Sequence, residues 1–396
     1  MSAGFKTAII GGGAAGFFLA VNLKEMMPEM EVSIFERSHR VLTKVEISGG
    51  GRCNCTNSFA QVTDLSQVYP RGHRLLKRLF NVFNHEDAFR WFEQHGVPLV
   101  TQDDECVFPQ AQDAHAIIDC FLSQARRHHI NIYTSQKIQS LDAVRDFDYV
   151  VVTTGGSPKG EGLRWLSDLG HEIELPVPSL FTFSINAPQL LALQGIVVNN
   201  TIVHIPGTKL RAEGPLLITH WGMSGPAILK LSSYAARHLA EQHYQAPLSV
   251  NWIRQNEAEA QAALYEMVVI QAHKQLTTCN PFGLQQRLWS YLLEKALGHR
   301  ISIRYQELNK KDINRLTNIL VNDEYQIAGR AAFKDEFVTC GGISLKAVNP
   351  NTLESRHVPH LFFAGEVLDI DGVTGGFNFQ AAWTTAYTVA SAIKKR

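Results

Sequence analysis

The sequence carries no excess of charge of either sign. Lys and Arg together number 37, as do Asp and Glu, so the formal net charge of the 396 residues is zero. Proteins that bind nucleic acid or acidic membranes through long-range electrostatics usually show a basic excess, so we expect no nucleic-acid partner. Uninterrupted apolar runs are also too short to cross a bilayer, and no membrane association is expected.

Cysteine is scarce and scattered. Of the six cysteines, only Cys53 and Cys55 lie close together, which argues against a disulfide framework. A secretory signal is also absent, because a strand-like run and a glycine turn begin within the first dozen residues. These absences predict a cytoplasmic protein. No group of His, Cys and acidic residues has metal-site spacing, so no metal is expected.

The chain is long enough for two or three domains, and its apolar content of 45% can fill their cores. It opens with a strand at 6–10, a glycine turn, an apolar helix and a strand at 31–36. It closes with a buried strand at 361–364 and a helix at 377–394. The simplest architecture is a doubly wound α/β domain completed by the C-terminal segment, with the middle of the chain as an insertion. Further helices are expected at 73–82, 86–95 (capped by Asn84), 113–128, 257–276 and 281–297, and further strands at 97–100, 106–108, 131–134, 137–141, 149–153, 181–185, 201–205, 216–219 and 325–339.

The opening turn reads Gly11-x-Gly13-x-x-Gly16. Glycine is needed where the turn is tight, where backbone approaches a pyrophosphate and where helix meets strand, while the helix N-terminus supplies amide donors. Glu36 lies twenty residues after Gly16, at the end of the next strand, and can accept hydrogen bonds from a ribose diol. The alternative is a glycine turn with a purely structural role, but such a turn would not account for the strand before it, the helix after it and Glu36 at this distance. The motif predicts a dinucleotide site, for either NAD or FAD.

Two further segments favour FAD. Residues 44–57 (KVEISGGGRCNCTN) place three glycines where backbone can approach a flat ring, beside Arg52 and Asn54. Residues 363–380 (FAGEVLDIDGVTGGFNFQ) join a strand end to a helix start, whose dipole favours negative charge on a reduced flavin. The alternatives are a solvent loop for the first segment and an acidic Ca²⁺ loop for the second, although the acid spacing does not match such a loop.

These segments together carry a family resemblance. Residues 9–16, 48–57, 338–345 (VTCGGISL) and 363–380 resemble the bacterial FAD-binding flavoproteins labelled aminoacetone oxidase-like, or NAD(P)/FAD-dependent oxidoreductases of the bile-acid-inducible N type. Residues 217–232, which contain THWGMSGP, resemble the insert of that family. The similarity covers nearly the whole chain in order. It implies an α/β fold with a Rossmann-type, glutathione-reductase-like FAD-binding domain, an inserted β-barrel-like domain and a small helical module.

The expected division of the chain follows this resemblance. It comprises an FAD-binding domain at 1–185 and 337–396, a barrel-like insert at 186–253 and 300–336, and a helical module at 254–299. One segment departs from the family pattern. After Thr154-Gly155-Gly156 the chain has only the short stretch 157–162, where a longer Tyr-, Pro-, Gly- and Ser-rich loop is expected. The activity of the family therefore does not carry over to this chain by resemblance alone.

The predicted cofactor-binding residues come from both ends of the chain. They are Gly11, Gly13, Ala14, Ala15, Gly16, Glu36, Arg37, Lys44, Gly50, Gly51, Arg52, Cys53, Asn54, Ile138, Thr154, Gly155, Gly365, Glu366, Asp369, Gly375, Gly376, Phe377 and Asn378.

No catalytic residue is assigned, but two candidates stand out. Cys53 could exchange electrons with the flavin together with Cys55, or both could be small side chains that fit beside the ring. His220 could move a proton near neutral pH, or it could simply pack or cap a helix. Ser224 precedes Gly225-Pro226 and is suited to cap the next helix.

The leading functional interpretation is an FAD-dependent oxidoreductase that transfers hydride or electrons between FAD and an unidentified small organic substrate or acceptor. The sequence holds one dinucleotide motif, so NAD(P)H would act as a transient donor without a domain of its own. Two alternatives stay open: a flavin-dependent RNA-modifying enzyme and a non-catalytic flavin-binding protein. The oligomeric state is not predicted.

Overall fold

The computed structural model describes residues 4–331 and 338–396 and divides the chain into two compact units. The first unit comprises Met1–Pro178 and Val338–Arg396, and the second comprises Ser179–Phe337. The first unit is therefore built from two stretches of sequence separated by the whole of the second.

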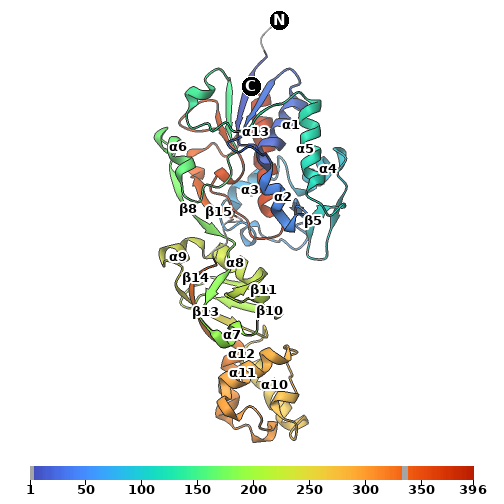
Figure 1. The fold of residues 1–396 in the computed structure, drawn as a ribbon, viewed down its shortest axis with the longest axis vertical. Coiled ribbons are helices and arrows are strands. Elements are labelled where there is room, and N and C mark those ends of the chain that lie inside the picture. The colour runs from blue at the N-terminus through green and yellow to red at the C-terminus, as the bar shows by residue number, and fades with distance from the viewer. Residues whose placement is uncertain (1–3, 332–337) are drawn as a thin grey trace. The chain divides into compact units, whose positions relative to one another are not determined.

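A five-stranded parallel sheet lies at the centre of the first unit (Figure 1). Apolar and largely β-branched strands fill it, and Ile9 and Val151 are fully buried because helices or loops cover both faces. The chain continues from β1 to β2 and β6 on one side of the sheet and returns later to β7 and β16 on the other side of β1. Ligands of such sheets bind at the carboxyl ends of the strands near the point where the direction changes. The strand order is β16 (Leu361–Phe363), β7 (Tyr149–Val152), β1 (Lys6–Ile10), β2 (Glu31–Phe35) and β6 (Asn131–Tyr133).

Helices α1 (Ala14–Met26) and α13 (Phe377–Lys394) pack side by side although they come from opposite ends of the chain, as the blue and red helices of Figure 1 show. Their contact is aromatic: the rings of Phe18 and Trp383 have centroids 5.1 Å apart, and both side chains are fully buried. The other helices of this unit are α2 (Thr43–Ile47), α3 (His73–Leu79), α4 (His85–Gln94), α5 (His115–Arg127) and α6 (Arg164–Asp168). Two small sheets complete it: β3 (Thr56–Asn57), β5 (Cys106–Pro109) and β4 (Leu99–Thr101), and β8 (Ile173–Ser179) with β15 (Val338–Ile343).

The second unit is a closed barrel with helices. Barrel and helices share one hydrophobic core, which includes Trp252, Trp289 and Leu316. The strands follow the order β10 (Val197–His204), β11 (Arg211–Ile218), β12 (Gly222–Ser224), β9 (Phe183–Ile185), β14 (Asp323–Arg330) and β13 (Ala246–Asn251). The helices are α7 (Pro188–Leu191), α8 (Pro226–Tyr234), α9 (Ala236–Glu241), α10 (Glu257–Ile270), α11 (Gln286–Leu297) and α12 (Lys310–Val321).

The expected domain boundaries cut through two of these groups. Strand β9 pairs with β12 and β14, so residues 183–185 belong to the barrel and not to the FAD-binding domain that was expected to end at 185. Helix α12 packs against α10 and α11, although it begins after the expected end of the helical module at 299. The three-part division itself stays a prediction, because the contacts separate two units.

Several expected elements have different bounds. The strand predicted at 137–141 is wrong: these residues form no strand, because the left-handed backbone of Ser135 interrupts the extended chain after β6. The helix predicted from 281 begins at Gln286, since the Asn280 side chain holds a turn by bonding the Phe282 amide and the Leu284 carbonyl. Part of the strand predicted at 325–339 lies outside the described residues.

The helix predicted from 257 to 276 ends at Ile270, because Gln275 bridges to Arg304. The predicted Asn84 cap is confirmed: its side chain accepts from the amides of Glu86 and Asp87. In the described ranges, no helix combines the length and the apolarity that a bilayer crossing requires.

Candidate functional site

The glycine turn after β1 is shaped by close contacts. A Cβ on Gly16 would lie 2.1 Å from the Gly11 carbonyl oxygen, and a Cβ on Gly11, whose φ is +120°, would lie 2.5 Å from the Thr153 carbonyl oxygen. These two positions therefore need glycine for packing. A Cβ on Gly13 would meet no atom within 4 Å, so space is open in front of this residue.

Helix α1 starts directly behind this open space. No side chain caps its N-terminus, and its first turn contains no acidic residue. Backbone amides and the positive end of the helix dipole therefore remain available for an anion, as a pyrophosphate requires. Ala14 and Ala15 begin the helix with side chains small enough to leave that approach open.

Glu36 is fixed beside the turn at the carboxyl end of β2. Its Oε2 accepts from the Gly12 amide at 2.8 Å, and its Oε1 accepts from the Ser38 amide at 2.8 Å. The remaining lone pairs of the carboxylate can accept from a ribose diol. Arg37, next to Glu36, is exposed. The Gln136 amide donates to the Glu36 carbonyl, and Ile138, two residues further along, is half-buried. These residues form the corner expected for the nucleoside.

The C-terminal segment reaches the same turn. A Cβ on Gly365 would lie 2.9 Å from the Ala15 Cβ, which places the end of β16 against the start of α1. Glu366 then bonds the Lys44 ammonium at 2.7 Å through Oε2, and its Oε1 accepts from the Thr339 amide at 2.9 Å. Gly155, after β7, lies next to this carboxylate, with its built Cβ 3.7 Å from Oε2. Segments from α2, β7, β15 and β16 thus converge on one carboxylate.

The three glycines after α2 take successive left-handed conformations. Gly49, Gly50 and Gly51 have φ values of 57°, 69° and 84°, and no atom would lie within 4 Å of a Cβ on Gly50. The guanidinium of Arg52 folds back onto the protein, 4.3 Å from the Phe108 ring and hydrogen-bonded to Gly49 and Gln112. Its polar atoms therefore organise the loop.

Asn54 connects that loop to the start of α13. In the amide orientation that its neighbours require, its nitrogen donates to the Thr56 and Val107 carbonyls at 2.8 and 3.2 Å, and its oxygen accepts from the Gly376 amide at 3.2 Å. A Cβ on Gly376 would lie 2.1 Å from the Thr56 carbonyl oxygen, so this approach requires glycine.

At the start of α13, the side chains of two predicted cofactor-binding residues contact other parts of the protein. The Asn378 side chain bonds both the amide and the carbonyl of Gly372, at 2.8 and 2.9 Å. The Phe377 ring packs against Phe59 and Tyr69, with centroids 5.1 and 5.9 Å away. No side chain caps this helix either, so its backbone amides are the groups that can face a flavin.

The flanking segment contains a buried ion pair that the sequence does not reveal. Arg71 binds Asp371 with both Nε and Nη2, and Asp371 is fully buried. Asp369 is 8% exposed, and its amide bonds the Ile343 carbonyl. Since Arg71 is 300 residues distant in sequence, only the fold brings this pair together. It fastens the 365–376 segment to the residues before α3.

The cysteine pair lacks the properties of a reactive dithiol. Burial raises the pKa of the Cys53 thiol to about 12, although a hydrogen bond with Ser48 opposes the rise. Burial, with the nearby Cys53, also raises the pKa of Cys55 well above its ordinary value, and Cys55 donates to the Val107 carbonyl. Both are free thiols. At neutral pH neither is a thiolate, which favours the interpretation of small side chains that fit the loop.

His220 lies in the second unit, on the turn between β11 and β12. Its ring contacts Trp221 with centroids 3.9 Å apart, and both residues line a cavity of about 340 Å³ together with Gly195 and Thr219. The predicted cap role of Ser224 is wrong: Gly225 is the N-cap of α8, with no side-chain cap, and the Ser224 hydroxyl bonds that of Thr182 because Ser224 ends β12.

The described residues hold no group of three or more His, Cys, Asp or Glu side chains placed to bind a metal ion. In the first unit, the turn at 11–16, Glu36, the loop at 48–57 and the segment 365–378 form what we call the cradle. The cradle offers the uncapped N-termini of α1 and α13, open space at Gly13 and Gly50, and the fixed carboxylate of Glu36. This donor set fits a dinucleotide.

The model of the HI0933-like protein Rossmann domain family matches residues 5–392. The chain belongs to this family. The HI0933-like chain is thus a flavoprotein with a Rossmann-type FAD-binding fold, as the resemblance predicts, and an FAD-dependent oxidoreductase. The individual contacts from the residues above to FAD stay predictions.

Curated relatives align along almost the entire HI0933-like chain. The 3-dehydro-bile acid delta(4,6)-reductase of Clostridium scindens is 25% identical over 415 residues, which cover 99% of each chain. The ribosomal RNA dihydrouridine synthase of Escherichia coli is 27% identical over 412 residues, covering 98% of this chain and 97% of the relative. The enzyme of that name from Haemophilus influenzae is 26% identical over 420 residues and covers 100% of both.

Proposed function

We propose that the HI0933-like chain reduces a carbon–carbon double bond conjugated to a carbonyl group. The observation that carries this proposal is that relatives with different names act on the same type of bond. A 3-oxo compound with delta(4,6) double bonds is a conjugated dienone, and forming dihydrouridine saturates a double bond conjugated to a ring carbonyl. The reactive pattern common to both is therefore the substrate class that best fits this chain.

When bound and reduced, FAD supplies the hydride for such a reduction. The substrate carbon remote from the carbonyl takes up the hydride, and the carbon next to the carbonyl takes up a proton. The protein contributes the uncapped N-terminus of α13, whose dipole favours negative charge, and the loop at 48–57 that approaches the cofactor. The buried thiols of Cys53 and Cys55 take no part, because neither is ionised.

A small dienone is the first candidate substrate. The test is anaerobic mixing of photoreduced holoenzyme with a 3-oxo-4,6-dienoic bile acid while the flavin absorbance is followed. Saturable return of the oxidised flavin spectrum, with a product two hydrogens heavier by mass spectrometry, supports the proposal. Flavin that stays reduced with both this compound and RNA overturns it.

Reduced nicotinamide is the electron donor that we propose for this cycle. The chain has one dinucleotide motif, so the donor would bind transiently at the flavin. Stopped-flow reduction under nitrogen with NADH and with NADPH tests this. Bleaching whose rate rises linearly with donor concentration agrees with transient binding, whereas tight saturation requires a second nucleotide site.

Uridine in RNA is the second candidate, and one surface of the second unit favours it. Between residues 272 and 315 the sequence has eight Lys or Arg and three Asp or Glu, although the whole chain is neutral. Lys310, Lys311 and Arg315 are exposed on one face of α12. The nearby acid Asp312 is buried and bonded to Arg300 at 2.9 and 3.0 Å, so it does not neutralise that face. Such a face suits contact with phosphates.

The two candidates are separated by binding to ribosomal RNA in rising salt. If RNA is the substrate, Lys310→Gln/Lys311→Gln weakens binding by about tenfold and lowers the salt dependence, since two phosphate contacts are lost. Arg126→Gln/Lys395→Gln, which removes equal charge from the first unit, is the control. Equal weakening by both variants, or no salt dependence, removes the RNA candidate and leaves the dienone.

A further inference from the structure

The guanidinium of Arg52 is a cation of the cradle that no carboxylate neutralises. In the described ranges, no Asp or Glu side chain forms an ion pair with it. Two other basic side chains that contact the cradle differ in this respect. Lys44 bonds the Glu366 carboxylate at 2.7 Å, and Arg71 bonds the fully buried Asp371. A positive charge is therefore left over on the loop at 48–57.

Most of the hydrogen-bond donors of Arg52 are unused. A guanidinium has five N–H groups. In the described part of the chain, Nε donates to the Gly49 carbonyl and Nη1 to the Gln112 side-chain oxygen, both at 3.2 Å, the long end of the normal range. The Phe108 ring supports one face of the group at 4.3 Å, and the residue is only partly buried. The group is thus positioned, while one N–H of Nη1 and both of Nη2 remain for a ligand.

The loop that carries Arg52 lies against the start of α13. Asn54, two residues further along, accepts from the Gly376 amide at 3.2 Å in the orientation that its neighbours require. Two residues before Arg52, no atom lies within 4 Å of a Cβ built on Gly50. The unused donors therefore belong to a loop that combines open space with contact to the helix end suited to face a flavin.

The proposed reduction requires a donor for one particular oxygen. As the substrate carbon remote from the carbonyl takes up hydride, the electron pair of the double bond shifts and leaves an enolate oxygen with negative charge. A proton from water then adds to the carbon next to the carbonyl, and the carbon–oxygen double bond forms again. Donors that are already in position stabilise such a developing oxyanion strongly.

We propose that Arg52 binds the carbonyl oxygen of the substrate through its unused N–H groups and stabilises the enolate. This assignment rests on the proposed function and makes Arg52 a catalytic residue of that reaction. It holds for a dienone and for a uracil ring alike, because both carry the conjugated carbonyl. The bonds to Gly49 and Gln112 then serve to orient the guanidinium.

The kinetic test compares photoreduced wild-type holoenzyme with Arg52→Met during anaerobic reoxidation. With saturating 3-oxo-4,6-dienoic bile acid, the variant should react about 100-fold more slowly, the usual loss on removal of one oxyanion donor, whereas the half-saturating concentration should change far less. Ferricyanide accepts single electrons and has no carbonyl, so its rate should change by less than about twofold. Arg52→Lys keeps the charge and should recover part of the loss. Arg40→Met, which removes an exposed cation paired with Glu46, is the control.

A second measurement needs no turnover. The dienone, labelled with carbon-13 at its 3-oxo carbon, is bound to the oxidised holoenzyme and observed by NMR. Its carbonyl signal should move downfield in the wild type, because a cationic donor withdraws electron density from the carbonyl group. Arg52→Met should bind the dienone without this shift, and the Arg40→Met control should retain it.

Dienone reoxidation of Arg52→Met within about threefold of the wild-type rate overturns the assignment. Equal slowing with dienone and ferricyanide also overturns it, as does an equal loss of FAD affinity in the Met and Lys variants, because Arg52 would then only organise the loop. If ribosomal RNA reoxidises the wild type and the dienone does not, the same comparison is made with RNA. A wild-type holoenzyme that neither compound reoxidises removes the proposed function, and the assignment of Arg52 with it.

Discussion

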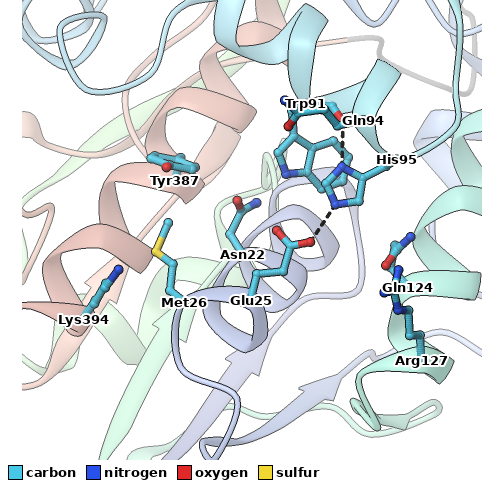
Figure 2. A pocket seen from close by; sticks show the side chains of 10 residues that line it. All are labelled: Asn22, Glu25, Met26, Trp91, Gln94, His95, Gln124, Arg127, Tyr387 and Lys394. Atoms are coloured by element: carbon cyan, nitrogen blue, oxygen red, sulfur yellow. Dashed lines mark hydrogen bonds and ion pairs between the residues drawn. The ribbon is translucent and has the colours of Figure 1, made fainter.

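The two ends of helices α1 and α13 are built on different principles. At the N-terminal ends, the cradle consists of backbone amides and glycines held by close contacts, such as the 2.1 Å that a Cβ on Gly16 would have to the Gly11 carbonyl. Towards the C-terminal ends, a cavity is lined by long polar and aromatic side chains from four helices, among them Glu25, His95 and Lys394 (Figure 2). Backbone sites leave a local sequence motif, whereas side-chain sites depend on packing. The predictions below test this contrast.

The largest effect should come from glycine substitutions in the turn after β1. Gly16→Ala forces a methyl group against the Gly11 carbonyl and should destabilise the apoprotein by about 3 kcal/mol. Gly13→Ala meets open space, so it should leave apoprotein stability within about 0.5 kcal/mol but lower FAD affinity at least about tenfold. Urea unfolding and fluorimetric FAD titration measure these quantities. Unchanged FAD affinity in Gly13→Ala would show that the pyrophosphate does not pass this residue.

The next effect concerns Glu366, which pairs with the half-exposed Lys44. Glu366→Gln should lower FAD affinity by about tenfold if the carboxylate bonds the cofactor, since a hydrogen bond to a charged group is worth about 1.5–3 kcal/mol. Apoprotein stability should change by about 1 kcal/mol, because Lys44 is half exposed to solvent and the Gln oxygen can still accept from the Thr339 amide. Glu46→Gln breaks the exposed pair with Arg40 and is the control. Equal FAD affinities in the two variants would remove Glu366 from the cradle.

A smaller, pH-dependent effect is expected at the other end of the helices. Burial alone lowers the pKa of His95, but its hydrogen bonds to the Glu25 carboxylate and the Trp91 carbonyl outweigh burial and raise the pKa above 6.5. A raised folded pKa stabilises the protein below the unfolded pKa, and this contribution is lost as pH rises through the folded value. Of the neighbouring groups, Arg127 opposes the shift.

His95→Gln should therefore destabilise the protein by about 1 kcal/mol more at about pH 5.5 than at about pH 8.5, measured by urea unfolding. Glu25→Gln should abolish most of the same pH dependence in a chain that keeps His95. FAD affinity should be unchanged in both variants. A loss of FAD affinity would show that the two helix ends are coupled, contrary to the contrast drawn above.

The smallest effect is expected at the buried thiols. With a pKa raised to about 12, Cys53 should resist alkylation in the native holoenzyme at neutral pH, and Cys55 should resist as well. Peptide mapping after iodoacetamide treatment measures this, with the partly exposed Cys279 as the internal positive control. Cys53→Ser should keep flavin reoxidation within about twofold. A stronger loss would revive the dithiol hypothesis.

The parts of the molecule that depend on local pattern were predictable. Helix α13 has the predicted bounds, the Asn84 cap is present, and the turn at 11–16 meets the segment that begins at Gly365. In these places the chemistry is carried by the backbone and by neighbours in sequence. The family resemblance then extended the prediction to FAD.

The rest depends on contacts that no local pattern encodes. Arg71 and Asp371 form a buried pair across 300 residues. The sequence of the 48–57 loop also does not indicate that the Arg52 guanidinium turns back onto the Phe108 ring. The strand predicted at 137–141 was wrong, because the backbone of Ser135 is left-handed and interrupts the extended chain after β6. The side chain of Asn378 bonds the backbone of Gly372, which the sequence does not indicate, and the predicted contact of Asn378 with the cofactor stays a prediction. Side chains of one type serve several purposes, and packing selects among them.

The discontinuity of the first unit has a consequence for biosynthesis. While the ribosome makes the second unit, β7 lacks its neighbour β16, and the α1 residues Phe17 and Phe18 lack the cover of α13. An unpaired strand edge and bare aromatic rings are the features that promote aggregation. The α/β unit can therefore close its sheet and cover these rings only after residues 361–394 have left the exit tunnel.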